Sequence, residues 1–257
     1  MWLTIGGRQY RDGELTLAEV VGRLGEGVST SGPAPGELAA AIERSDEGDG
    51  VAVLTVSRRM SAVFGSAELA AKMLEDRAVS VVDTRTAAGG QALVVLAAAR
   101  AARRGAGLPD VVAAAGEAAA KARLLATLPS LEYLARGGRV PGAAAWGARW
   151  LGLNPLFEFV DGRARPLRPA RSREQACARI VASLKASAPS SGGPGRSAGA
   201  SHLHVAALHA LEPELAERML GEVDRTLEPA SAFAVSFSPV MIAHTGPGLA
   251  GLAWWWD

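Results

Sequence analysis

The chain has 257 residues, 49% of them hydrophobic, and its 27 basic and 26 acidic residues leave a formal net charge of only +1. This length and apolar content are enough to bury the core of one large or two modest domains. Because the basic residues are spread along the chain, we expect no nucleic-acid-binding surface. The single cysteine, Cys177, excludes an internal disulfide and a cysteine-built metal site, which fits a reducing cytoplasm.

Two apolar stretches are too short to act as membrane or export signals. Residues 1–7 have no basic segment and no long apolar core, so we expect no signal peptide. The apolar run at 93–99 ends at Arg100, well short of the roughly 20 residues that span a bilayer. The sequence therefore predicts a soluble protein.

Residues 30–39 combine a hydroxyl pair, a Pro/Gly turn and the start of a helix. Pro35 suits the first helical turn, and Glu37 suits the positive end of the helix dipole. Thr30 and Ser31 would then lie beside free backbone N–H groups, an arrangement that can hold an oxygen-rich anion. The same pair could simply cap the helix, which is the commoner use of such residues.

Strands and helices alternate from residue 51 to residue 125. We predict strands at 51–56 and 79–82, and helices at 66–74, 87–104 and 110–125, with Ser66 as the cap of the first helix. This alternation predicts βαβ units around a parallel sheet, in which ligands bind beyond the carboxyl ends of the strands. The polar residues at or just after those ends are Thr30, Ser57, Ser61, Asp83 and Thr84.

From residue 153 the pattern changes to a second α/β layer. An Asp-Gly pair at 161–162 predicts a hairpin over 155–167. Further elements are expected at 173–186 (helix), 204–208 (strand), 213–220 (helix) and 232–237 (strand), with a mobile Ser/Gly/Pro-rich loop at 188–201. We therefore expect an α/β fold of two stacked domains, 1–152 and 153–257, the first with a largely parallel sheet.

Two short motifs match catalytic or cofactor patterns without the context those patterns need. The G-x-S-x-G match around Ser197 lies in the predicted loop, with no strand before it and no helix after it, so we expect no nucleophile there. The G-x-G-x-x-G match at 246–251 is followed by only six residues, which excludes a βαβ dinucleotide site.

The histidines and the terminal tryptophans each allow two interpretations. His202, His204 and His209 lack a carboxylate at a recognised metal-ligand spacing, so we expect satisfied or solvated histidines and no metal. The three tryptophans at 254–256 either make a transient membrane contact or form a final edge strand that packs alternate indoles into the core, which we favour.

Five ordered segments carry a family resemblance that covers the chain from Ile5 onward. They are TSGPAPG at 30–36, SRRMSAVFGSA at 57–67, VVDTR at 81–85 leading to Gly89 and Gly90, LEYLARGGR at 131–139, and HTGPG at 244–248. In this order and spacing they resemble the DegV family of bacterial fatty-acid-binding proteins, some of which are acyl-carrier subunits of fatty acid kinase.

The resemblance implies two α/β domains with a long-chain, palmitate-like fatty acid between them and its carboxylate on hydroxyl groups. Thr30 and Ser61 match the family positions that hold the carboxylate, and His244 matches a histidine near the head group. Arg171 matches a basic position suited to phosphate in kinase-coupled relatives, and Arg173 is the second candidate for that position. Ser31 and Thr245 lie beside these positions. Locally, Ser61 could equally be a helix cap, and His244 a structural hydrogen-bonding group of its turn.

The chain departs from the family pattern at two places. Residues 61–63 read Ser-Ala-Val where the family usually has Ser-Gly-Thr, so head-group contacts are expected to be fewer. Family members also usually begin with a strand and an Asp-Ser-Thr or Asp-Ser-Ala loop, whereas this chain starts near the segment at 10–13 that follows them. Either the true start lies upstream, or the protein is a reduced variant with weakened binding.

The resulting functional hypothesis is a non-enzymatic lipid carrier of the cytoplasm, without cofactor or metal, and with a fatty acid kinase subunit as its candidate partner. Burying about fourteen methylenes at ~0.8 kcal/mol each gives a gross gain near ~11 kcal/mol, so the tail supplies the affinity. The Ala, Val and Leu residues that line the tunnel cannot be singled out from the sequence. The alternatives are a hydrolase with Ser61, His244 and Asp83 as its triad, and a degenerate, non-binding relative.

Overall fold

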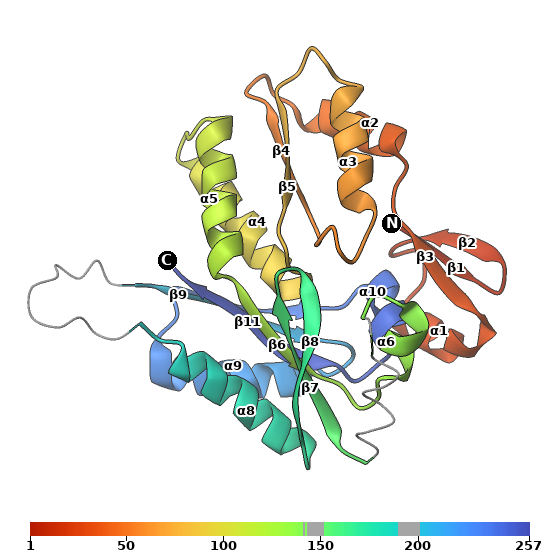
Figure 1. Ribbon diagram of the computed structural model, residues 1–257, viewed down its shortest axis with the longest axis vertical. Helices are drawn as coiled ribbons and strands as arrows, with labels where there is room; N and C mark the ends of the chain where they lie inside the picture. Colours follow the sequence, from red (N-terminus) through yellow and green to blue (C-terminus); the bar gives the residue numbers. More distant parts are fainter. Residues whose placement is uncertain (141, 143–151, 190–200) are drawn as a thin grey trace, which may run out of the picture.

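The computed structural model describes residues 1–140, 142, 152–189 and 201–257, which form three β-sheets with covering helices (Figure 1). This mixed architecture confirms the predicted α/β class. The G-x-S-x-G match and nearly all of the predicted 188–201 loop lie outside the described residues. None of the helices in the described ranges is long and apolar enough to cross a bilayer.

The chain begins with a small antiparallel sheet that the sequence analysis did not predict. Its strands β1 (Trp2–Ile5), β2 (Arg8–Arg11) and β3 (Val28–Ser31) lie in the order β2-β1-β3, with α1 (Leu17–Gly22) and a 3₁₀ turn (Leu24–Glu26) between β2 and β3. Leu3 and Ile5 are fully buried, and Thr30 pairs opposite Leu3. The sheet therefore fixes the backbone position of Thr30.

A βαβ unit follows and confirms the predicted parallel pairing. After α2 (Pro35–Ser45), strand β4 (Val51–Thr55) pairs in parallel with β5 (Val79–Asp83), and α3 (Val63–Lys72) connects them. Pro35 occupies the first turn of α2 as expected. The prediction that Ser66 caps α3 is wrong: the helix starts at Val63, and the Ser66 N–H already donates to the Ala62 carbonyl.

The largest sheet is mixed and has six strands in the order β10-β9-β11-β6-β7-β8. They are β6 (Arg123–Thr127), β7 (Asn154–Val160), β8 (Arg163–Ala170), β9 (Leu203–His209), β10 (Ser231–Ser236) and β11 (Ala250–Trp256). Strand β6 precedes the predicted domain boundary at 152/153 in the sequence, whereas the other five strands of this sheet follow it. The boundary itself stays a prediction.

The helix predicted at 110–125 extends too far toward the C-terminus. Helix α5 (Leu108–Lys121) ends at Ala122, whose ψ of 129° is extended, and β6 starts at once. No glycine or proline separates the two elements, so the sequence has no ordinary stop signal there. What makes residues 123–127 a strand is their place between two partner strands, β11 and β7.

The tryptophan-rich segment forms a strand, as favoured, but not at an edge. Strand β11 pairs with β9 on one side and β6 on the other, so it is central. Trp254 is fully buried on one face, where its Nε1 donates to Ser187 Oγ at 2.7 Å. Trp255 stacks on His204 with ring centroids 5.1 Å apart. The indoles thus pack into the interior instead of being displayed for a membrane.

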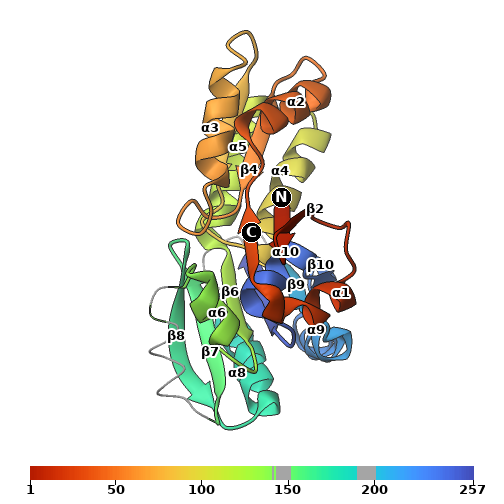
Figure 2. The same cartoon turned by 90° about the vertical axis from the view of Figure 1, so that its right-hand side faces the viewer.

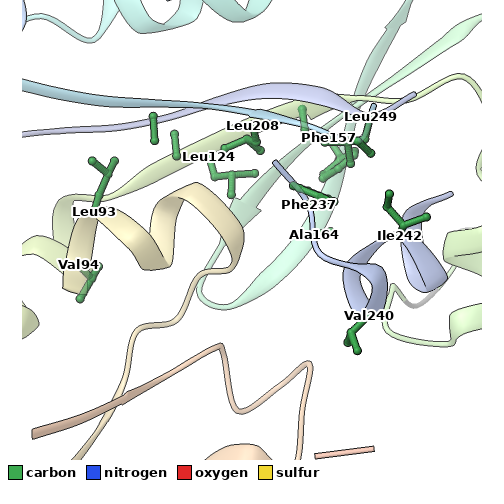
Figure 3. Packing of buried hydrophobic residues seen from close by; sticks show 14 of the residues in the cluster. Leu93, Val94, Leu124, Phe157, Ala164, Leu208, Phe237, Val240, Ile242 and Leu249 are labelled. Atoms are coloured by element: carbon green, nitrogen blue, oxygen red, sulfur yellow. The ribbon is translucent and has the colours of Figure 1, made fainter. Parts of the chain in front are cut away.

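Helices cover the two faces of the six-stranded sheet differently (Figures 1 and 2). Helices α8 (Arg173–Ala186) and α9 (Pro213–Leu227) cover one face and bury one apolar cluster. Helix α4 (Ala88–Arg103) lies on part of the other face, where a Cβ at Gly89 would come within 2.3 Å of the Leu208 side chain. Figure 3 shows this second cluster, from Leu93 of α4 across the sheet to Ile242 of α10 (Pro239–Thr245).

The predicted Asp-Gly hairpin is confirmed, and its turn docks on the loop after β4. Asp161 and Gly162 both have positive φ, 49° and 76°. The fully buried Ser57 donates its Oγ proton to the Gly162 carbonyl at 2.9 Å. A Cβ at Gly162 would lie 2.3 Å from that Oγ, so only glycine fits this contact.

We predict that Gly162→Ala destabilises the protein more than Gly7→Ala. Both glycines have similar φ, 76° and 78°, so both substitutions carry a left-handed backbone cost of roughly 1–2 kcal/mol. Only Gly162 has a neighbour that the new methyl would strike, which adds about 1–3 kcal/mol. Urea unfolding of both variants measures the difference; equal losses would show that the docking contact is not tightly packed.

Candidate functional site

A cavity of about 780 Å³ lies between the βαβ unit and the open part of the six-stranded sheet. This size is typical of sites for small organic ligands. Its wall is mainly apolar and comes from elements far apart in the sequence, which is why the sequence could not assign it. The larger apolar lining residues are Met1, Leu54, Val56, Met60, Val63, Leu124, Leu134, Val140, Phe157, Phe159, Leu208, Phe237, Val240, Met241 and Leu249.

Five of the six predicted ligand residues line this cavity, namely Thr30, Ser31, Ser61, His244 and Thr245. Arg171 does not: it is exposed after β8, and its backbone N–H donates to Gln175 Oε1 at 2.8 Å. Its neighbour Arg173 pairs with Glu212 at 3.0 Å and donates to the Gly248 carbonyl. A phosphate role for Arg171 stays a prediction.

Thr30 reaches the cavity from the end of β3, and its Oγ1 lies 2.7 Å from His244 Nε2. The interpretation of Thr30 and Ser31 as a helix cap is wrong, because the N-cap residue of α2 is Ala34. The carboxylate of Glu37 accepts the Ala34 N–H at 2.9 Å at the start of this helix. The Thr30 hydroxyl is instead hydrogen-bonded to His244 in the cavity wall.

Ser61 lies just before Ala62, the N-cap residue of α3, and its role in holding a carboxylate stays a prediction. Its Oγ accepts the Val63 N–H at 3.3 Å, at the start of α3, and the residue also lines the cavity. Gly32 allows the Thr30 segment to lie close to the start of α3, because a Cβ at this position would lie 3.0 Å from Val63 Cγ2. The two hydroxyl-bearing segments thus run side by side at one end of the cavity.

His244 lies in the last turn of α10, largely buried between Thr30 and the end of α6 (Glu132–Gly137). A Cβ at Gly137 would lie only 2.8 Å from Nδ1, and this nitrogen is buried with no hydrogen-bond partner among the described residues. Burial, together with the positive charge of Arg139, lowers the pKa of the imidazole to about 4. The ring is therefore neutral at pH 7.

Gly137 and Arg139 are site residues to which the sequence analysis gave no role. Both belong to the LEYLARGGR segment, and Arg139 lines the cavity while its NH1 donates to the Gly137 carbonyl at 2.7 Å. The glycine pair after a short helix was the available signal. Gly246 of the HTGPG turn packs directly on Tyr133 of α6, which holds the two segments together.

The triad of Ser61, His244 and Asp83 is not assembled in the part of the chain that the structure describes. Asp83 does not line the cavity, and its Oδ1 accepts the backbone N–H groups of Arg85 at 2.9 Å and Arg58 at 3.3 Å. His244 Nε2 is engaged with Thr30. Thr84 is also structural, since its hydroxyl donates to the Thr55 carbonyl at 2.8 Å.

The three histidines His202, His204 and His209 have hydrogen-bond partners within the protein, which agrees with the prediction that they are satisfied. His202 and His204 face the Asp257 carboxylate at 3.1 and 3.3 Å, and His209 Nδ1 accepts the Glu212 N–H at 3.3 Å. Within the described ranges, no three His, Cys, Asp or Glu side chains group in a way that could hold a metal. The GxGxxG match leads into strand β11 and not into a helix.

The fold and the cavity together define an α/β protein with an apolar compartment that is polar at one end. A family model described as "Uncharacterised protein, DegV family" matches residues 1–256. A DegV domain-containing protein of Mycobacterium tuberculosis is 33% identical over 97% of this chain and 86% of its own length. One from Deinococcus radiodurans is 30% identical over 98% and 88%, respectively. The chain therefore belongs to the DegV family, as the sequence motifs predicted.

Solved structures agree with this assignment. A DegV family protein from Thermus thermophilus, for which fatty acid binding is described, has a TM-score of 0.87 at 29% identity, with 99% of this chain and 89% of that chain covered. The fatty acid binding protein DegV from Bacillus subtilis has a TM-score of 0.83 at 24% identity, with coverages of 100% and 90%. At that identity the second comparison shows the fold alone.

We predict that the neutral, buried His244 makes folding stability fall as pH falls. Its pKa is about 4 in the folded protein and 6.5 in the unfolded chain, so between these values only the unfolded state takes up the proton. Relative to a His244→Leu variant, the wild type should lose up to about 3 kcal/mol from pH 7 to pH 4. Urea unfolding at both pH values measures this loss, and an NMR midpoint near 6.5 for the ring would contradict it.

Proposed function

We propose that the protein binds a long-chain fatty acid, with the hydrocarbon tail in the apolar cavity and the carboxylate on Thr30 and Ser61. The observation that carries this proposal is that Thr30 and Ser61, on two neighbouring segments, both line a mainly apolar cavity of about 780 Å³. The Thermus thermophilus relative, described as binding fatty acid, supports the same ligand class.

The hydrocarbon tail of such a ligand needs the apolar wall of the cavity, and its carboxylate needs hydrogen-bond donors. Burial of the tail gives about 0.8 kcal/mol per methylene, and aromatic and aliphatic side chains such as Phe157, Phe159 and Leu208 provide the surface. A carboxylate costs several kcal/mol when it leaves water without partners. Hydroxyl donors satisfy it without a fixed counter-charge, so the ligand can still leave.

The protein acts, in this proposal, as a cytoplasmic carrier and not as an enzyme. Thr30 has His244 Nε2 within 2.7 Å, but no carboxylate among the described residues accepts from His244 Nδ1 and Asp83 lies outside the cavity lining, so the third member of a Ser-His-Asp arrangement is missing there. The carrier would present the carboxylate to a separate kinase subunit, with Arg171 at the phosphate. Cys177 is a free, buried thiol, in keeping with a reducing compartment.

Lipid extraction of the purified protein followed by mass spectrometry tests the proposal. A stoichiometric long-chain fatty acid is the expected result, and delipidated protein should bind hexadecanoate again. Turnover of an ester substrate would favour a hydrolase. Absence of both a co-purifying lipid and rebinding would favour the degenerate relative and refute the proposal.

We predict that Thr30→Val lowers the affinity for hexadecanoate by about 10- to 100-fold without abolishing binding. The variant keeps the β-branched shape of the strand residue but loses the hydrogen bond to a charged group, worth roughly 1.5–3 kcal/mol. Thr4→Val in the neighbouring strand β1 is the control and should bind like the wild type. Displacement of a fluorescent fatty acid measures the affinities; equal binding by both variants would remove Thr30 from the site.

We also predict that Ala164→Phe selectively weakens the binding of long chains. Ala164 on β8 lines the cavity, so a phenyl ring there occupies space that the tail needs. Arg165→Phe, the next residue along the strand, is exposed and serves as control. Relative to the wild type, the Ala164 variant should lose more affinity for hexadecanoate than for decanoate, whereas the Arg165 variant should change neither. Equal losses for the two fatty acids in the Ala164 variant would place the tail elsewhere.

A further inference from the structure

Strand β4 presents an unpaired backbone edge at the wall of the cavity. Val51 and Thr55 face β5, since their backbone groups bond to the residues just before and just after that strand. Because hydrogen-bonding groups alternate between the two edges along a strand, those of Leu54 point away from β5. In the described part of the chain β4 and β5 form a sheet of only two strands. The Leu54 carbonyl therefore has no neighbouring strand to bond to.

A side chain from α4 takes the place of that missing backbone partner. Gln91 lies in the first turn of α4, and its Nε2 donates to the Leu54 carbonyl at 3.3 Å. A carbonyl can only accept, so the amide nitrogen must face it and the amide oxygen must lie on the other side of the group. This hydrogen bond thus fixes the orientation of the Gln91 amide.

The Oε1 atom of Gln91 is left without a hydrogen bond from any described residue. It is not sealed inside the protein, because the unpartnered and fully buried side-chain atoms of the described residues are His244 Nδ1 and Trp255 Nε1. Gln91 lines the cavity, beside the apolar lining residues Leu54 and Ala88. The amide therefore offers one acceptor and one further N–H to an apolar part of the wall.

Gln91 stands apart from the residues predicted to hold the carboxylate. It belongs to α4, whereas Thr30 ends β3 and His244 lies on α10. Figure 3 shows α4 and α10 at opposite ends of the apolar cluster that borders the cavity. A fatty acid held at Thr30 would therefore meet Gln91 with its hydrocarbon chain and not with its carboxylate.

We propose that Gln91 is a specificity-determining residue, which selects a long-chain fatty acid with a hydroxyl group on its chain. This rests on the fatty acid site proposed above and names its ligand more closely. A hydroxyl group can donate its proton to Oε1 and accept the second proton of Nε2. A plain hydrocarbon chain would cover Oε1 without replacing the hydrogen bond that the oxygen makes with water, which lowers the affinity.

Other polar substituents satisfy the Gln91 amide less well than a hydroxyl group. A keto group accepts but cannot donate, so Oε1 stays unpaired. A second carboxylate has the same limitation and also repels the partial negative charge of Oε1. An ammonium group can donate, but it would be a cation without a counter-charge in an apolar wall. The group that fits is neutral and carries a proton to donate.

Binding measurements with a positional series of hydroxylated fatty acids test this specificity. The probes are hexadecanoate and the monohydroxylated hexadecanoates with the hydroxyl at each chain position in turn. The wild type should bind at least one isomer as tightly as hexadecanoate or more tightly. It should bind the keto acid of the same position about 10-fold more weakly than that isomer. A wild type that binds every hydroxylated isomer more weakly than hexadecanoate would overturn the proposal.

The variant Gln91→Met keeps the length of the side chain and removes both polar atoms. It should shift the ratio of the affinities for the preferred isomer and for hexadecanoate by about 10- to 100-fold toward hexadecanoate. Because both ligands are compared on one variant, a general loss of stability cancels from this ratio. Gln9→Met changes an exposed glutamine outside the cavity lining and should keep the wild-type ratio. An unchanged ratio in Gln91→Met would mean that the amide only satisfies Leu54.

NMR on the wild type gives a second readout that needs no substitution. The chain has three glutamines, Gln9, Gln91 and Gln175, so ¹⁵N-glutamine labelling resolves their side-chain amides. The preferred isomer should move the Gln91 signals more than hexadecanoate does and leave those of Gln9 in place; equal shifts would contradict the proposal. If the wild type binds hexadecanoate but prefers no isomer, only the role of Gln91 fails. If it binds neither ligand, the proposed function fails as well.

Discussion

The hydrogen bond between Thr30 and His244 joins residues 214 positions apart and closes the polar end of the cavity. It connects the small N-terminal sheet to helix α10, two elements that otherwise meet mainly through apolar side chains. A buried imidazole is tolerable only if it is neutral and partnered. The chain accordingly has a glycine, Gly137, where it packs against the ring, and another, Gly32, where the Thr30 segment meets Val63.

The cavity is the part of the core that the protein itself does not fill. Helices α8 and α9 bury one face of the six-stranded sheet, whereas α4 lies on only part of the other. Beyond α4, side chains such as Phe157 and Leu249 face the cavity. A hydrocarbon tail there would complete the packing of the sheet, so that ligand binding and folding stability are linked by the same apolar surface.

The β7–β8 hairpin joins the two sides of this cavity. Its strands carry Phe159 and Ala164 on the cavity wall, and its Asp-Gly turn is held by the buried hydroxyl of Ser57 in the loop that leads to Ser61. The loop that leads to Ser61 and the two strands of the cavity wall are therefore positioned by one contact. This is why a glycine at 162 matters both for the turn and for the site.

Local signals determined much of the chain: α8 begins and ends as predicted, the Asp-Gly pair forms its hairpin, and β4 and β5 form a parallel βαβ unit. The motifs also placed Thr30, Ser61 and His244 in one site, because each motif is a contiguous string of residues. Only the tertiary structure decided that β6 and β11 are central strands and that residues 2–31 form a sheet, since strand pairing depends on distant partners. The cavity lining, the contact of Gly137 with His244 and the hydrogen bond between Thr30 and His244 arise for the same reason: each joins segments that lie far apart in the sequence.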